Sequence, residues 1–157
     1  MKVALLQVDK TQESYLMEGI DNYTKRLGNY TSFKIQTINV PKAIRQRSQQ
    51  EQKLEEAKMI LKEISQEDTL VLLDEKGKEF TSVEFSKFIS QKQNASVKRL
   101  VFLIGGPFGF DESVYKRADF KLALSQMTFS HQMVRLFFVE QLYRAYTIIK
   151  GEKYHHL

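Results

Sequence analysis

Short apolar runs alternate along the chain with longer segments in which apolar residues recur at helical spacing. Runs of four to eight apolar or alternating residues are typical of strands, whereas an apolar residue at every third or fourth position indicates an amphipathic helix. The pattern predicts strands at residues 2–8, 33–40, 69–73, 99–104 and 120–124, and helices at about 11–27, 45–64, 81–91, 111–117 and 131–150. This order favours an α/β fold with a five-stranded, mostly parallel sheet and helices on both faces.

Two of the predicted strands, 69–73 and 99–104, contain almost no polar residue within the run. Such strands are buried on both faces of a parallel sheet. The first is expected to end at Asp74 and to be followed by a turn through 76–78. Thr81 and Glu84 then form the spacing of a capping box, which predicts the start of a helix.

Composition limits the class of protein. The 157 residues are 42% apolar and 27% charged, which predicts one globular domain over 1–157 and excludes a disordered or fibrous chain. The absence of cysteine excludes disulfides and thiolate metal sites, and it suits the cytoplasm. No signal peptide is evident, and charged residues interrupt the apolar run 134–149. We therefore expect a soluble protein with no membrane contact.

Lys and Arg number 24 against 19 Asp and Glu, a net charge of +5. This excess is spread along the chain and forms no basic tail. Taken alone, it is typical of a solvated surface as much as of a polyanionic partner.

Three strand ends carry candidate binding residues, because ligands of parallel sheets bind beyond the carboxyl ends of the strands. These ends are Leu73–Asp74, Ile104–Gly106 and Leu124–Ser125. The run 105–109, Gly-Gly-Pro-Phe-Gly, matches neither the dinucleotide fingerprint nor the phosphate loop. Together with 124–129, it is expected to hold one flat, mostly apolar ligand.

The final predicted helix is apolar on nearly all sides, which indicates burial and, in a domain of this size, contact with a second copy of the chain. Arg135 and Arg144 on this helix need partners, and Glu140 is the nearby candidate. His131, near the start of the helix, is a catalytic candidate, although a structural role is the commoner one for such a histidine.

Six distinct motifs follow one another along the whole chain. They are Tyr-Thr-Lys-Arg-Leu at 23–27, Leu-Leu-Asp-Glu-Lys-Gly-Lys at 72–78, Ile-Gly-Gly-Pro-Phe-Gly at 104–109, the segment 122–132, Glu-Gln-Leu-Tyr-Arg-Ala at 140–145 and Gly-Glu-Lys-Tyr-His at 151–155. In these motifs the chain resembles the SPOUT-class methyltransferases, in the group of ribosomal RNA large-subunit methyltransferase H.

The resemblance implies a SPOUT fold with a carboxyl-terminal trefoil knot, a homodimer, and S-adenosylmethionine as cofactor without a metal. The knot overrides the general rule against knotted chains. The implied activity is methylation of N3 of a pseudouridine in 23S rRNA of assembled ribosomes. The implied cofactor-binding residues are Leu73, Gly105, Leu124, Ser125, Gln126, Met127, Thr128 and Phe129.

For the chemistry on the nucleotide we expect Arg144, Tyr154 and His155, with His155 as the candidate general base. Without the resemblance, Tyr154 and His155 would be interpreted as a frayed terminus. The chain departs from many relatives at Asp9, where they have Gly, and at Ser130, where they have Pro. His156 replaces the usual terminal Arg or Lys, so RNA contact there is expected to be weaker at neutral pH.

Three other functions stay open from the residues. One is methylation of tRNA, and another is non-catalytic binding to the ribosome as an assembly factor. The third, a nucleotide or flavin binder, is disfavoured by the missing phosphate-binding fingerprints.

Overall fold

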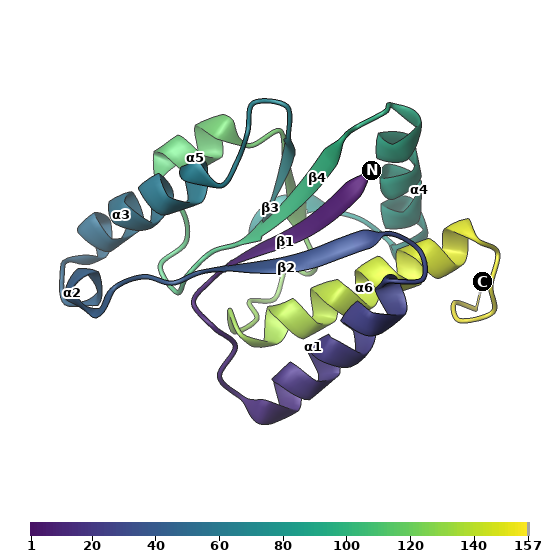
Figure 1. The fold of residues 1–157 in the computed structure, drawn as a ribbon, viewed down its shortest axis with the longest axis horizontal. Coiled ribbons are helices and arrows are strands. Elements are labelled where there is room, and N and C mark those ends of the chain that lie inside the picture. Colours follow the sequence, from purple (N-terminus) through teal and green to yellow (C-terminus); the bar gives the residue numbers. More distant parts are fainter. Residues whose placement is uncertain (157) are drawn as a thin grey trace.

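A computed structural model describes residues 1–156 and contains one sheet with helices on both sides (Figure 1). Its strands are β1 (Lys2–Val8), β2 (Ser32–Ile38), β3 (Thr69–Glu79), β4 (Arg99–Ile104) and β5 (Phe120–Ala123). Its helices are α1 (Ser14–Leu27), α2 (Lys42–Arg45), α3 (Gln49–Lys62), α4 (Ser82–Asn94), α5 (Glu112–Arg117) and α6 (Met133–Ile149). The strand order is β2-β1-β4-β3-β5, and each pairing is parallel. The predicted α/β class and five-stranded sheet are confirmed.

The central strand β4 shows why the apolar run 99–104 has no polar alternation. Leu100 and Phe102 are fully buried in one core, with side chains from α1, α4 and α6. Val101 and Leu103 are fully buried in a second core, with side chains from α3 and α5. Because successive strand residues point to opposite faces, both faces of β4 must be apolar. Figure 1 shows α1 and α6 beside each other, with α3 and α5 across the sheet.

The predicted turn at 76–78 is wrong. β3 continues to Glu79, and its pairing with β5 changes register so that Leu73 and Lys78 are both partners of Leu122. Gly77 lies at this crossing, and a Cβ atom there would come within 2.7 Å of backbone atoms of Lys121 and Leu122. Lys-Gly-Lys is typical of a turn, but tertiary pairing with β5 keeps the segment extended.

Several predicted helices differ from the structure at their ends: α1 begins at Ser14 rather than at about 11, and α4 continues to Asn94 rather than to 91. The segment 45–64 contains one helix, α3, which begins at Gln49 because the Ser48 hydroxyl caps it, accepting a hydrogen bond of 3.2 Å from the Glu51 amide; Arg45 is the last residue of the separate helix α2. The last helix begins at Met133 rather than 131, although the Ser130 hydroxyl accepts from the Met133 amide at 3.0 Å. The capping box of Thr81 and Glu84 is confirmed at α4.

Asp9 follows β1 with φ of +61°, in the left-handed region that favours glycine. This conformation explains how the position accommodates the glycine of many relatives. Aspartate is among the residues that tolerate the left-handed region, and here its carboxylate also accepts a hydrogen bond from the Val40 amide at 3.0 Å and pairs with Arg45.

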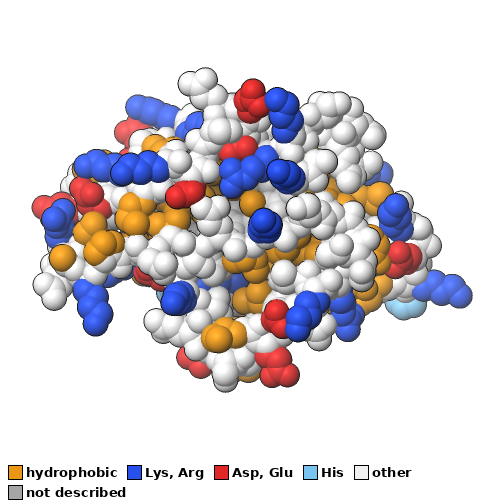
Figure 2. Space-filling model, viewed as in Figure 1, with side chains coloured by type: hydrophobic (Ala, Val, Ile, Leu, Met, Phe, Trp, Pro, Cys, Tyr) orange, Lys and Arg blue, Asp and Glu red, His pale blue; other side chains and the backbone are white. Residues whose placement is uncertain are grey.

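The surface in the view of Figure 2 mixes basic and acidic side chains, with no continuous basic field. This matches the charge pattern along the sequence. Within residues 1–156, none of the helices is both long and apolar enough to cross a membrane.

The close approach at Gly77 generates a prediction about stability. Gly77→Ala places a methyl group against backbone that cannot rotate away, so the free energy of unfolding should fall by about 1–3 kcal/mol in urea titrations. Gly28→Ala is the matched control, because Gly28 ends α1 with a helical φ of −57° and a Cβ atom there would approach only the Lys25 carbonyl, at 3.2 Å. Equal stabilities of the two variants would contradict the prediction.

Candidate functional site

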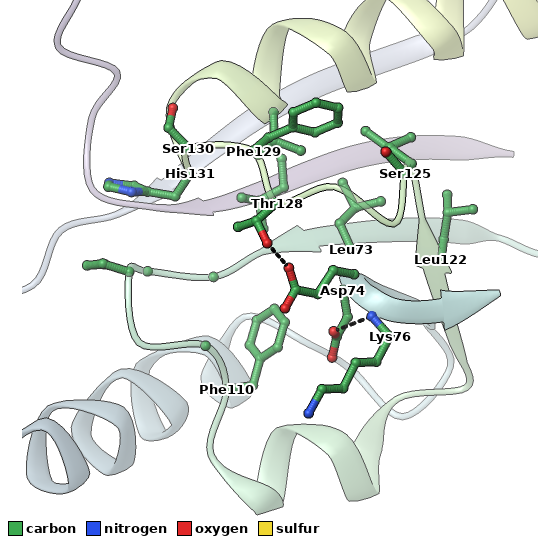
Figure 3. Close-up of a pocket in the computed structure, with 18 of the residues that line it drawn as sticks. Leu73, Asp74, Lys76, Phe110, Leu122, Ser125, Thr128, Phe129, Ser130 and His131 are labelled. Carbon is green, nitrogen blue, oxygen red and sulfur yellow. Dashed lines mark hydrogen bonds between the residues drawn. The ribbon is translucent and has the colours of Figure 1, made fainter. Parts of the chain in front are cut away.

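The three predicted strand ends meet at one cavity of about 590 Å³ (Figure 3). Leu73 comes from β3, Gly105 follows β4, and Leu124 follows β5. Of the eight predicted cofactor-binding residues, seven line the cavity: Leu73, Gly105, Leu124, Ser125, Met127, Thr128 and Phe129. Gln126 lies in the same segment but is not part of the lining.

The cavity has an apolar wall and an acidic rim. Leu73, Phe110, Leu122 and Leu124 supply the apolar surface, and Asp74 and Glu75 supply carboxylates. Tyr115 donates to Asp74 at 2.7 Å, and Thr128 donates to Glu75, so both carboxylates are held in place. The dashed lines in Figure 3 mark the bond of the Thr128 hydroxyl to Glu75 and the bond of the Lys76 amide to Asp74. Such a site suits a ligand that is flat, largely apolar and positively charged at one end.

Tyr115 and Lys76 belong to the cavity but were missed by sequence reasoning. Lys76 lies in the segment expected to turn, and Tyr115 lies on the short helix α5. Burial, together with the hydrogen bond to Asp74, raises the pKa of Tyr115 to about 12, so its phenol stays protonated at neutral pH. No pattern along the chain marks a tyrosine whose partner is 41 residues away.

The glycine-rich segment after β4 forms a tight wall of the cavity. A Cβ atom on Gly105 would lie 2.8 Å from the Phe110 ring, and one on Gly106 would lie 3.1 Å from the Glu56 carboxylate. Gly109 has φ of +79° and donates its amide to the Gly106 carbonyl at 3.2 Å. The glycines therefore let the segment fold back between Phe110 and α3.

Arg135 lies behind the part of the cavity wall that contains His131 and binds the His131 carbonyl. Its side chain is completely buried, and its guanidinium donates to the carbonyls of Val8, Asp9 and His131 at 2.7–3.0 Å and to the Thr11 hydroxyl at 3.0 Å. The expectation that Glu140 is its partner is wrong, because Glu140 pairs with Arg144 instead. Burial lowers the pKa of Arg135 to about 10, which still leaves it charged at neutral pH.

His131 lines the cavity next to the Arg135 guanidinium and its four acceptors, which we call the Arg135 clamp. Burial, followed by the nearby charge of Arg135, lowers the pKa of His131 below its usual value. Its ring is therefore neutral at neutral pH, and its carbonyl is held by Arg135 at 3.0 Å. These contacts favour the structural interpretation of His131.

The three predicted catalytic residues lie together at the other end of α6. Arg144 donates to His155 Nδ1 at 3.2 Å, and its guanidinium lies 4.7 Å from the centre of the Tyr154 ring. Arg144 and Tyr154 both donate to Glu140 Oε1, at 2.5 and 3.0 Å. None of the three lines the cavity, and ten residues of helix, about 15 Å, separate Arg144 from Val134 at the cavity wall.

The contact with Arg144 determines the tautomer of His155. A guanidinium has only donors, so Nδ1 must be the acceptor, and the neutral ring carries its proton on Nε2. His155 therefore presents a hydrogen-bond donor outward. It can accept a proton only after its contact with Arg144 is broken.

Comparison with known proteins identifies the family to which the chain belongs. A family model described as "Predicted SPOUT methyltransferase" matches residues 1–155. The chain belongs to the SPOUT methyltransferase family. The resemblance expected from the motifs is thereby confirmed, whereas the trefoil knot stays a prediction.

Curated members of the SPOUT methyltransferase family match over nearly the full length. The chain is 56% identical to a protein of Cytophaga hutchinsonii named ribosomal RNA large subunit methyltransferase H, over 99% of this chain and 100% of that protein. Proteins of the same name from Parabacteroides distasonis and Flavobacterium johnsoniae are 50% and 51% identical, each over 99% of both chains.

A solved structure supports the same fold. The structure of a probable methylase family protein from Haemophilus influenzae covers 99% of this chain and 70% of its own chain, with a TM-score of 0.50 and 10% sequence identity. Among residues 1–156, no group of three or more His, Asp or Glu side chains is arranged to hold a metal ion.

The buried clamp generates a second prediction. Arg135→Met removes the donors to one buried carbonyl, that of Val8, and to the partly buried carbonyls of Asp9 and His131, so the free energy of unfolding should fall by about 2–4 kcal/mol. The control is Arg47→Met, whose side chain is 49% exposed and should change stability by less than about 0.5 kcal/mol. Urea titration followed by circular dichroism measures both, and an unchanged Arg135→Met protein would rule out the clamp.

Proposed function

We propose that this SPOUT methyltransferase uses S-adenosylmethionine to methylate N3 of a pseudouridine in 23S rRNA of the assembled ribosome. The observation that carries the proposal is the cavity at the three strand ends, in a chain about half identical to three proteins named for methylation of large-subunit rRNA. The formal net charge of +5 is compatible with an RNA partner.

The cavity fits the proposed cofactor. Its volume of about 590 Å³ accommodates a nucleoside with an amino-acid side arm, and Leu73, Leu122 and Leu124 offer apolar surface for the adenine. The Asp74 and Glu75 carboxylates are suited to the hydroxyl groups and positive charge of such a molecule. When bound, the cofactor supplies an electrophilic methyl group on a sulfonium, so the protein has mainly to position the accepting nitrogen and help remove its proton.

Arg144, Tyr154 and His155 act on the nucleotide in this proposal. Arg144 contributes a positive charge near the anion that forms when N3 loses its proton, and the Nε2–H of His155 is suited to donate to a carbonyl next to N3. Tyr154 offers an aromatic face and a hydroxyl to orient the base. For His155 to act as the general base and take the N3 proton at Nδ1, its hydrogen bond from Arg144 must first be broken, because Nε2 already carries a proton.

We also propose a homodimer, since the cavity and the carboxyl-terminal tail, residues 151–156, lie at opposite ends of α6 in one chain. Phe129, Met133 and Phe137, next to the cavity, are 37–43% exposed, and the rings of Phe129 and Phe137 are 5.0 Å apart. A second hollow of about 330 Å³ adjoins them. Antiparallel packing of two such faces about a two-fold axis would bring the tail of one chain to the cavity of its partner.

A variant of His155 tests the reaction. His155→Ala should abolish transfer of labelled methyl groups to ribosomes that lack the modification, while calorimetry still detects cofactor binding. His155→Gln keeps an N–H near the position of Nε2 and should retain part of the activity if His155 donates, but none if it is the base. Undiminished turnover by His155→Ala would remove His155 from the chemistry.

The same assay is run on free rRNA, free tRNA and whole ribosomes. Methylation of whole ribosomes alone supports the proposal, and methylation of free tRNA supports the alternative substrate. Cofactor binding without transfer to any of the three would favour a non-catalytic ribosome-binding protein.

Mixing two inactive variants tests the shared site. Thr128→Trp fills the cavity, and His155→Ala disables the tail. If each site uses one chain's cavity and the other's tail, half of the dimers in an equal mixture carry one working site of two, so about a quarter of wild-type activity returns. If each chain uses its own tail, the mixture stays inactive. Phe137→Glu should be monomeric in light scattering and inactive in the same assay.

A further inference from the structure

The motif at 23–27, in the last turns of α1, has no part in the proposed reaction, yet its first residue touches the tail. Tyr23 Oη lies 3.3 Å from Tyr154 Oη, across 131 residues of sequence. Tyr154 Oη also lies 3.0 Å from Glu140 Oε1. A phenol has one proton, and the carboxylate can only accept, so Tyr154 donates to Glu140. Tyr23 must then be the donor to Tyr154.

One oxygen atom of Glu140 accepts hydrogen bonds from both Arg144 and Tyr154. Its Oε1 accepts from Arg144 Nε at 3.1 Å and Nη2 at 2.5 Å, and from the Tyr154 hydroxyl. The side chains of Arg144 and Glu140 are only 25% and 18% exposed, so little water competes for these bonds. The position of the Tyr154 ring is thus determined from two sides, by α6 through Glu140 and by α1 through Tyr23.

Aromatic packing fixes Tyr23 itself. Its ring centre lies 5.7 Å from that of Tyr143, which in turn lies 4.8 Å from that of Tyr154. The guanidinium of Arg26, from the same motif, lies 5.5 Å from the Tyr23 ring and 5.6 Å from the Tyr143 ring. The Tyr23 hydroxyl therefore points at the tail without needing to be ordered by it.

The backbone of the tail is anchored separately. Gly151, with φ of +69°, turns the chain back after α6, and the Glu152 amide donates to the Thr147 carbonyl at 2.9 Å. Tyr30 donates to the Glu152 carboxylate at 2.7 Å. Removal of the Tyr23 hydroxyl alone should therefore leave the tail in place and change only the orientation of Tyr154.

We propose that Tyr23 is a positioning residue, which orients the hydroxyl of Tyr154 before the nucleotide binds. This inference rests on the proposed function, because it assigns Tyr23 a role only through the action of Tyr154 on the nucleotide. Tyr23 touches no part of the cavity, so it should leave cofactor binding unchanged.

The test is a double-mutant cycle in ribosome methylation at saturating cofactor. Tyr23→Phe keeps the ring and its packing, and kcat should fall about five- to tenfold while the KM for the cofactor stays the same. Tyr154→Phe should lower kcat at least as much. In the double variant, Tyr23→Phe should add no further loss, because the hydroxyl that it orients is already absent.

The matched control is Tyr15→Phe, on the same helix with a side chain that is 61% exposed. It should have the wild-type kcat, and all variants should unfold at the wild-type temperature. Additive losses in the double variant, an unchanged kcat in Tyr23→Phe, or an altered KM for the cofactor would each overturn the positioning role.

The failures of the two proposals can be told apart. If Tyr154→Ala and His155→Ala keep the wild-type kcat, the tail has no part in the reaction and the proposed function of these residues fails. If those variants are inactive and Tyr23→Phe is fully active, only the positioning role fails.

Discussion

Arg135 places a positive charge where no solvent reaches it, and the backbone around it supplies the acceptors. A buried guanidinium with five N–H donors is tolerated only when nearly all of them are satisfied. Here the acceptors come from the end of β1, from the residues after it, and from the segment before α6. One side chain thereby joins parts of the chain that are more than 120 residues apart, and the wall of the cavity that contains His131 depends on that junction.

The cavity and the proposed catalytic residues lie at opposite ends of α6. The helix begins at the cavity and ends at the cluster of Arg144, Tyr154 and His155. Its buried side packs between α1 and α4, while Met133 and Phe137 stay exposed near the beginning. A single chain therefore carries the cavity and the proposed catalytic cluster at the two ends of one helix, and the length of that helix determines how two chains of the proposed dimer would have to meet.

Much of the fold could be predicted from the sequence because its signals are local. Leu100 to Leu103 form a buried strand from their composition alone, and Thr81 with Glu84 caps α4 as the spacing predicts. The position of the cavity could also be predicted from the three strand ends, because a parallel sheet places them at one edge. The partner of Arg144 was found at four residues' distance, on the same face of the helix.

The errors arise where backbone atoms or distant pairing decide the outcome. The acceptors of Arg135 are carbonyls, which every residue carries, so no side-chain pattern could have pointed to them. The contacts of Tyr115 with Asp74 and of Tyr23 with Tyr154 depend on the tertiary fold alone. The roles expected for Tyr154 and His155 came from the resemblance. Both residues follow Gly151 at the end of a helix, where no sequence pattern indicates a catalytic role.

The register change in β3 limits how this protein can vary. Leu73 and Lys78 both pair with Leu122 of β5, so the four residues between them belong to the extended strand β3 but have no partner of their own in β5. Those residues include Asp74, Glu75 and Lys76 of the cavity rim. Inserting or deleting one residue there would reverse the faces of Lys78 and Glu79. Side chains on this rim can therefore be exchanged, whereas a change of one residue in the length of the segment is expected to disturb the pairing of Lys78 and Glu79 with β5.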